Sequence, residues 1–455
     1  MNNKDKDFLG TAPIGKLLLS LALPTITAQL INMLYNIVDR IYIGHIPEAG
    51  ALALTVVRVC MPLILIVSAS AALVGSDSAP RASILMGKQE HDQAEQILGN
   101  CFALLFLISI VLTVILLAWN RPILLAFGAS ENTVEYGVAY MNIYALGTIF
   151  VQLTLGMNAF ITAQGFAKTG MLSVMIGAAA NIILDPIFIF VFGMGVRGAA
   201  LATILSQALS CTWVLAFLFG KKTFLKIKAS NLKLTRSIIM PSLALGLSTF
   251  IMQSSESVIS VCFNSSLLKY GGDLAVGAMT ILTSTMQFAM LPLQGIGQGA
   301  QPIMSYNYGA RNIDRMKKTF KLHLVISLIY STLFWLFVQL FPATFAGIFS
   351  SDPELVSFTA GALRIYCGAM FLFGIQLACQ MTFVAIGYAV CSIIVAVVRK
   401  FVLLLPLIFI VPMFVSNKTL GVYMAEPIAD AIAVTFTAIL FSIQFRKALR
   451  KLEKA

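Results

Sequence analysis

The chain has 455 residues, of which 59% are hydrophobic and 11% charged, with a net charge of +12 at pH 7 and a mean hydropathy of +0.90. This composition leaves too few polar side chains to cover a water-soluble globule, and so it excludes that class of protein. We therefore expect a polytopic, all-α integral membrane protein.

Twelve apolar segments are each long enough to cross about 30 Å of hydrocarbon as a helix. In chain order they lie near residues 15–40, 51–75, 96–119, 134–160, 170–192, 197–219, 237–263, 273–300, 320–342, 356–384, 390–415 and 421–444. The connections are short, so no soluble domain fits between them. The polar start MNNKDKD carries no short apolar core with a cleavage site, so no removable signal peptide is expected.

The positive charges are divided unequally between the two sides of the membrane. If both termini and the even-numbered loops share one side, that side carries 22 Lys and Arg residues, and the other side carries only Arg121, Arg197, Lys269 and Lys418. Lysine and arginine concentrate in cytoplasmic loops, so both termini are predicted to be cytoplasmic. The net charge of +12 therefore reflects the topology of the chain. It also favours contact with anionic lipid, and it does not indicate binding to nucleic acid.

The two halves of the sequence repeat each other at an offset of 222 residues. Matching pairs include Gly75 with Gly297, Pro80 with Pro302, Ser83 with Ser305, Gly87 with Gly309 and Asp92 with Asp314. We expect an N-terminal six-helix lobe at 1–220, a basic cytoplasmic linker at 221–236 and a C-terminal six-helix lobe at 237–455. Because six is even, the lobes should be related by a pseudo-two-fold axis along the membrane normal, which favours a cavity between them.

The first half carries the acidic and amide side chains that suit a cation. Asn181 and Asp185 are four residues apart and share one helix face. Pro186 follows and frees a backbone carbonyl nearby. An ionised aspartate at mid-membrane costs roughly 2.5–3.5 kcal/mol, so Asp185 needs a partner. Asp39 in span one and Thr203 in span six are the candidates.

The second half lacks an acid at the position that matches Asp185, so cation chemistry is expected mainly in the first lobe. Glu256 lies near Ser255, Ser260 and Asn264, and two readings stay open for it: a structural hydrogen-bond network, or contact with a drug or cation. The seven cysteines show no CxxC spacing and are read as packing residues. The three histidines show no metal-ligand spacing.

Two charges in span two are unexpected, Arg58 within the apolar run and Asp77 at its inner end. An unpaired arginine there should reach the outer interface or pair with an acid. Two readings stay open for Arg58. If it faces the cavity, it can pair with Asp39, which lies at a comparable depth on the neighbouring span, and compete with a bound cation, so that Arg58→Ala raises cation affinity; if it faces lipid, it only adds a cost.

Several pieces of the sequence together resemble the multidrug and toxic compound extrusion (MATE) transporters, most closely the bacterial branch of MepA-type drug exporters. They are VDRIYIG, NIILDPIFIF, GAALAT, APRASILMGK with its echo QPIMSYNYGA, and AEPIAD. The resemblance covers nearly the whole chain. It implies antiport of amphipathic, mostly cationic drugs outward against inward Na⁺ or H⁺, by alternating access in the cytoplasmic membrane.

The resemblance also implies roles for particular residues. The cation, Na⁺ if a metal ion, would bind at Asp39, Asn181, Asp185 and Thr203. The substrate would contact Tyr35, Met157, Asn158, Glu256, Gln287 and Gln380, and Pro24 and Pro186 would act as hinges. The protein would be no enzyme, would need no cofactor, and would work as a monomer among membrane lipids, with no nucleic-acid partner.

Two other functions remain as alternatives to the antiporter. A flippase of a lipid-linked precursor, with the same architecture, should place several Arg or Lys side chains deep in the central cavity, but the chain offers mainly Arg58 and Arg364. A membrane transferase would need paired aspartates to hold Mg²⁺ on a diphosphate, and no DDxxD-like cluster occurs.

Overall fold

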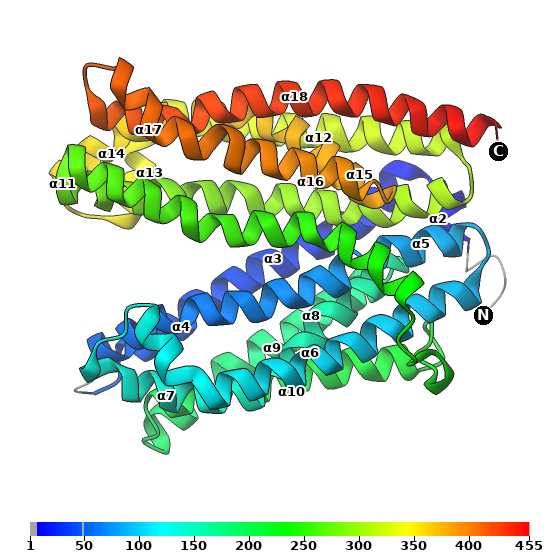
Figure 1. Ribbon diagram of the computed structural model, residues 1–455, viewed down its shortest axis with the longest axis horizontal. Coiled ribbons are helices and arrows are strands. Elements are labelled where there is room, and N and C mark those ends of the chain that lie inside the picture. The colour runs from blue at the N-terminus through cyan, green and yellow to red at the C-terminus, as the bar shows by residue number, and fades with distance from the viewer. Residues whose placement is uncertain (1–6, 48–49, 455) are drawn as a thin grey trace. The chain divides into compact units, whose positions relative to one another are not determined.

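The computed structural model describes residues 7–47 and 50–454, and every regular element in those ranges is a helix. Residues 1–6, which bear on the signal-peptide expectation, lie outside them. Figure 1 traces the helices in chain order. The first half contains α2 (Phe8–Thr11), α3 (Ile14–Gly44), α4 (Gly50–Ala71), α5 (Ala79–Gly87), α6 (His91–Ala126), α7 (Glu131–Leu146), α8 (Thr148–Ala163), α9 (Ala167–Pro186) and α10 (Val196–Phe219).

The second half contains α11 (Arg236–Gly309), α12 (Ile313–Leu340), α13 (Pro342–Phe349), α14 (Pro353–Tyr366), α15 (Phe373–Ala385), α16 (Ala389–Val397), α17 (Leu405–Phe414) and α18 (Lys418–Lys454). Short segments join some of these helices. Three are π-helical, η1 (Ala72–Ser76), η2 (Ile187–Val191) and η5 (Val398–Leu404), and two are 3₁₀ turns, η3 (Ala229–Asn231) and η4 (Met370–Leu372).

The helices supply the expected number of membrane spans. Among the described residues, nine helices are long and apolar enough to cross a bilayer, and two bent helix pairs meet the same test. Helix α11 is interrupted by Gly272, whose φ of 65° and ψ of −162° are not helical, so α11 holds two spans. The described chain therefore contains twelve spans, as predicted.

Spans four and ten were expected to be continuous helices, and both are bent. α7 and α8 meet at 53°, and α14 meets the η4–α15 segment at 46°. At the first bend a side chain on Gly147 would lie 2.4 Å from Ile204, so α10 packs closely against the glycine. At the second, Trp335 and Ser331 of α12 donate hydrogen bonds to backbone carbonyls that the break leaves open, at 3.1 and 2.9 Å. Both bends depend on a neighbouring helix.

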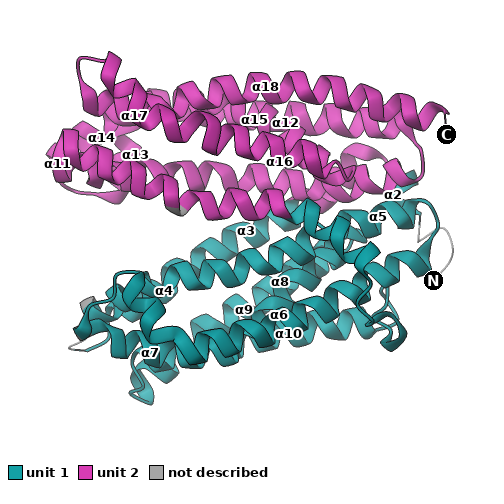
Figure 2. Cartoon of the chain, in the orientation of Figure 1, with its two compact units in different colours: residues 1–11, 23–246 teal, residues 12–22, 247–455 magenta. Residues whose placement is uncertain are grey.

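The chain forms two compact units, shown in Figure 2. Unit 1 comprises residues 1–11 and 23–246, and unit 2 comprises residues 12–22 and 247–455. These boundaries differ from the expected lobes, which met at a separate linker of residues 221–236. The first turns of α3 belong to unit 2, and the linker with the first turns of α11 belongs to unit 1.

The linker is anchored to unit 1 by a buried glutamine, which explains this difference. The side-chain oxygen Oε1 of Gln164 accepts hydrogen bonds from the backbone N–H groups of Phe224 and Leu225, at 2.8 and 2.9 Å. It also accepts one from the hydroxyl of Thr223, at 2.9 Å. The sequence signal of a basic loop gave no indication of this anchor, because Gln164 is distant in the sequence.

Two further side chains of α6 hold the same linker. Asn100 accepts a hydrogen bond from the backbone N–H of Thr235 at 2.7 Å. Glu95 accepts one from the N–H of Lys226 at 3.1 Å and forms an ion pair with Lys228. The hydrogen bond to Glu95 raises the pKa of the exposed Lys228 ammonium. The basic segment is therefore fixed along its backbone while its lysines face solvent.

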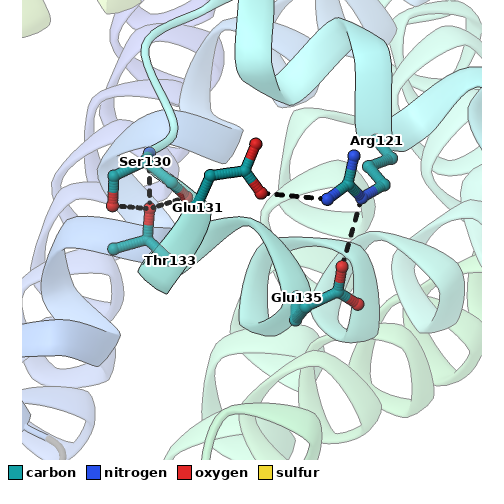
Figure 3. Close-up of polar contacts among 5 residues, drawn as sticks. All are labelled: Arg121, Ser130, Glu131, Thr133 and Glu135. Carbon is teal, nitrogen blue, oxygen red and sulfur yellow. Dashed lines mark hydrogen bonds and ion pairs between the residues drawn. The ribbon is translucent and has the colours of Figure 1, made fainter.

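The loop between α6 and α7 is fixed by a small polar network (Figure 3). Arg121 forms ion pairs with Glu131 at 3.0 Å and Glu135 at 3.2 Å. Ser130 and Thr133 form a capping box at the start of α7. The ion pairs are exposed, so solvent screens them and each contributes little to stability.

Candidate functional site

A small cavity lies inside unit 1 between α3, α8, α9 and α10, with a volume of about 50 Å³. That volume is enough for a water molecule or a small ion. Its polar lining residues are Asn32, Tyr35, Thr154, Asn181, Thr203, Ser206, Gln207 and Ser210. Three residues predicted for the site, Tyr35, Asn181 and Thr203, thus share one cavity.

The free polar atoms of this cavity are mostly hydrogen-bond acceptors. The hydroxyl groups of Thr203, Ser206 and Ser210 each donate to a backbone carbonyl, at 3.0, 2.7 and 2.7 Å. Their oxygen lone pairs therefore remain available. The side-chain carbonyl oxygens of Asn181 and Gln207 are buried and accept no hydrogen bond. A ligand that satisfies these oxygens must be a cation or a hydrogen-bond donor.

Two carboxyl groups meet beside the cavity. Asp185 is fully buried in the last turn of α9, and the amide of Asn181 donates to its Oδ1 at 3.3 Å. The carboxyl groups of Asp185 and Asp39 interact electrostatically with each other. Two neighbouring carboxyl groups avoid mutual repulsion only if they share a proton or hold a cation between them. The buried oxygens Oδ1 of Asp39 and Oδ2 of Asp185 have no hydrogen-bond partner among the described residues.

The break after α9 places Asp185. Pro186 ends α9, and the π-helical segment η2 follows it. A side chain on Gly198 would lie 2.7 Å from the backbone of Phe188, so the start of α10 packs directly on η2. This contact fixes the chain directly after Asp185. The irregular backbone expected at Pro186 is thus present as η2, and the freed carbonyl next to Asp185 stays a prediction.

The other residues expected to contact substrate do not line this cavity. Met157 is fully buried, and Asn158 donates to a backbone carbonyl of α9 at 3.3 Å. Gln287 is exposed on α11. Gln380 is buried and donates to the hydroxyl of Ser392 at 2.6 Å. Their substrate roles stay predictions, and Asn158 and Gln380 have structural hydrogen bonds.

Unit 2 contains a cluster of five charged residues that we call the acid–base cluster. Its members are Glu256 on α11, Arg399 and Lys400 in η5, and Glu426 and Asp430 on α18. Arg399 pairs with Asp430 at 2.8 Å and with Glu426 at 3.7 Å. Lys400 pairs with Glu256 at 2.6 Å.

The π-helical backbone of η5 explains how two adjacent cations are both buried and paired. Arg399 and Lys400 are consecutive, yet they reach acids on two different helices, α18 and α11. The guanidinium of Arg399 also lies over the ring of Phe373, 5.2 Å from its centre. π-helical turns often mark functional sites.

The sequence interpretation missed this cluster. The signals were present, because VVRKF places two cations inside an apolar run and AEPIAD places Glu426 and Asp430 four residues apart on one helix face. The expectation that Arg58 and Arg364 are the main cations inside the spans is therefore wrong. Arg364 is exposed and donates to a carbonyl of α12 at 3.2 Å.

The reading in which Arg58 pairs with Asp39 is also wrong. Arg58 is exposed, and it forms no ion pair among the described residues. The charged groups that act on Asp39 are Asp185 and its sequence neighbour Arg40. Within the described ranges, no group of three or more His, Cys, Asp or Glu residues is arranged to hold a metal ion.

Comparison with known proteins gives a consistent result. The sequence pattern of the MatE family matches residues 24–187 and 247–410. The multidrug export protein MepA of Staphylococcus aureus is 23% identical over 418 residues, which are 90% of each chain. Two solved structures, one of MATE in the bent conformation and one of an outward-facing multidrug resistance MATE family transporter of the MOP superfamily, are each 22% identical. Both cover 100% of both chains, with TM-scores of 0.93 and 0.91.

Proposed function

This chain belongs to the MatE family, and from that premise we propose that it is a cation-coupled antiporter that exports amphipathic, mostly cationic drugs across the cytoplasmic membrane. The family match confirms the resemblance read from the sequence, including its likeness to MepA. Residues 24–187 and 247–410 match the same pattern, in agreement with the predicted duplication.

The observation that carries the proposal is the contact between Asp39 and Asp185 next to a cavity of acceptors. Two buried carboxyl groups cannot both ionise cheaply without a positive charge between them. The pair therefore takes up one monovalent cation. Without that cation it carries the negative charge that attracts a cationic drug.

Competition for this charge couples the two fluxes. A cation that enters from outside reduces the negative charge of the pair and so favours release of the drug to the outside. Return of the emptied protein to the inward-open state allows the cation to leave and the next drug to bind. Asn181 positions the carboxyl group of Asp185, and Thr203 and Tyr35 complete the wall of the cavity.

Two cations fit this scheme, and different observations favour each. The mutual repulsion of the two neighbouring carboxyl groups favours H⁺, because one proton shared between them removes it. The acceptor-lined cavity favours Na⁺, since neutral oxygens and carboxylates are ligands for hard cations. We propose H⁺ as the coupling ion and Na⁺ as the second candidate.

Two prolines are proposed as the points at which unit 1 bends. The boundary between the residues of unit 2 and unit 1 in α3 falls between Ala22 and Leu23, one residue before Pro24. Pro186 lies between α9 and the π-helical η2, next to the carboxyl pair. A proline in a helix removes a backbone hydrogen bond, which lowers the cost of bending there.

A flippase is the less favoured function. It needs free positive charge inside the membrane to hold phosphate groups. The two buried cations of unit 2, Arg399 and Lys400, are paired with three acids, so the acid–base cluster offers no excess positive charge. We further propose that the protein acts as a monomer among membrane lipids, without a cofactor and without enzymatic activity.

Ethidium efflux from expressing cells tests the proposal. Cells that produce the protein should accumulate less ethidium than cells that carry the empty vector. Collapse of the ion gradients should remove the difference. Equal accumulation in both strains, with the protein present in the membrane, would contradict the proposal.

A further inference from the structure

The pair between Glu256 and Lys400 is unequal in its exposure to solvent. The side chain of Lys400 is 6% exposed, whereas that of Glu256 is 62% exposed. The ammonium lies 2.6 Å from Oε1 of the carboxylate. The ammonium of Lys400 is therefore buried, whereas the carboxylate of Glu256 that it pairs with is accessible to ligands.

The other acids of the cluster form their ion pairs with Arg399. Asp430 and Glu426 lie 2.8 and 3.7 Å from its guanidinium. Glu426 is also stabilised by the charge of Lys400, with which it forms no ion pair among the described residues. Glu256 is the acid with which Lys400 forms its ion pair. A buried lysine without a partner is costly, so Lys400 holds Glu256 more firmly than an exposed pair would.

We propose that Lys400 is a tethered counter-ion: its ammonium occupies the place beside Glu256 that a singly charged organic or inorganic cation would otherwise take. Lys400 is thus a specificity-determining residue of unit 2. It weakens the attraction of Glu256 for free monovalent cations. The cation exchange of the transport cycle is then confined to the carboxyl pair of unit 1.

This inference rests on the proposed function for the class of ligand, an amphipathic organic cation. Its physical basis is independent of transport. The Coulomb attraction between a carboxylate and a cation falls sharply when a second cation already lies within contact distance. Removal of the ammonium should therefore uncover a cation site at Glu256.

Ethidium binding to the purified, detergent-solubilised protein tests the inference by fluorescence polarisation. Lys400→Met keeps the length of the side chain and removes its charge, and we expect ethidium to bind roughly tenfold more tightly to it. Lys400→Arg retains the charge and should bind within about twofold of the unchanged protein. The double variant Lys400→Met with Glu256→Gln should return to the starting affinity.

Lys321→Met is the matched control, because it removes a lysine charge from an exposed position on α12. An affinity of Lys400→Met equal to that of the control would overturn the inference. So would a double variant that binds as tightly as Lys400→Met. If Lys400→Met does not fold, the ethidium affinity of Glu256→Gln alone tests the inference. A change in affinity under about twofold supports it, because Lys400 then already prevents Glu256 from attracting ethidium. A roughly tenfold loss of affinity contradicts it.

The outcomes separate this inference from the proposed function. Ethidium that binds to none of these proteins would contradict both. Ethidium that binds to the unchanged protein, with no gain in Lys400→Met, would contradict only the role of Lys400.

Discussion

The carboxyl group of Asp39 on α3 interacts with that of Asp185 at the end of α9. The interaction joins two segments of unit 1 that are far apart in the sequence, and it lies beside a cavity whose free atoms are mostly acceptors. Since a bound cation reduces the negative charge of the pair by one, occupancy by a cation and attraction of a cationic drug compete with each other.

Asp185→Asn should abolish coupled export and leave the amount of protein in the membrane largely unchanged. Asparagine cannot release a proton, and it costs less to insert than an ionised aspartate. Ethidium accumulation in expressing cells measures the loss, and immunoblots of the membrane fraction measure expression. Asp273→Asn changes an exposed acid outside the site and should export normally. Undiminished efflux by Asp185→Asn would refute the assignment.

Arg58→Ala should leave the concentration of coupling ion needed for half-maximal transport unchanged within about twofold. Arg58 is exposed and has no ion-pair partner among the described residues, so it does not compete at Asp39. Transport into proteoliposomes at increasing ion concentration measures this value. A shift to concentrations lower by about fivefold or more would show that Arg58 acts on the carboxyl pair after all.

Gln164→Leu should loosen the linker of residues 221–236. The substitution removes the acceptor for three hydrogen bonds, and the buried donors left behind cost about 1–3 kcal/mol of folding free energy. Trypsin should then cleave after the linker lysines faster in inside-out membrane vesicles. Gln164→Glu keeps an acceptor oxygen and is the matched control. Equal cleavage rates for the two variants would disprove the anchor.

Tags at both termini should be reachable only from the cytoplasm, because 22 Lys and Arg residues mark that side against four on the other. Antibody labelling of intact and permeabilised cells tests this orientation. A terminal tag that is labelled in intact cells would contradict the predicted topology.

The sequence predicted the twelve spans and the cavity residues Asn181 and Thr203 because hydrophobic length and polar atoms within apolar runs are local signals. The bend at Gly147 was not predictable in this way, since it depends on contact with Ile204 of another helix. The anchor at Gln164 was missed for the same reason. Contacts between residues of different helices cannot be inferred from the spacing of residues along one segment.

The acid–base cluster was missed for a different reason. Arg399 and Lys400 stand in a segment apolar enough to read as an ordinary span, and their partners on α18 and α11 are distant in the sequence. The π-helical turn that lets both cations face acids has no signature in the composition. A systematic search for every charge within a span would have singled them out.

Ethidium transport in proteoliposomes, with H⁺ and Na⁺ gradients imposed separately, tests most directly whether the Asp39–Asp185 pair couples the flux of ion and drug. We expect an H⁺ gradient to drive transport by the unchanged protein, and we expect Asp39→Asn and Asp185→Asn each to abolish this response. A response to Na⁺ alone, lost in the same variants, would retain the carboxyl pair but replace the coupling ion. Transport that follows either gradient equally well in Asp185→Asn would contradict the claim that the Asp39–Asp185 pair couples the two fluxes.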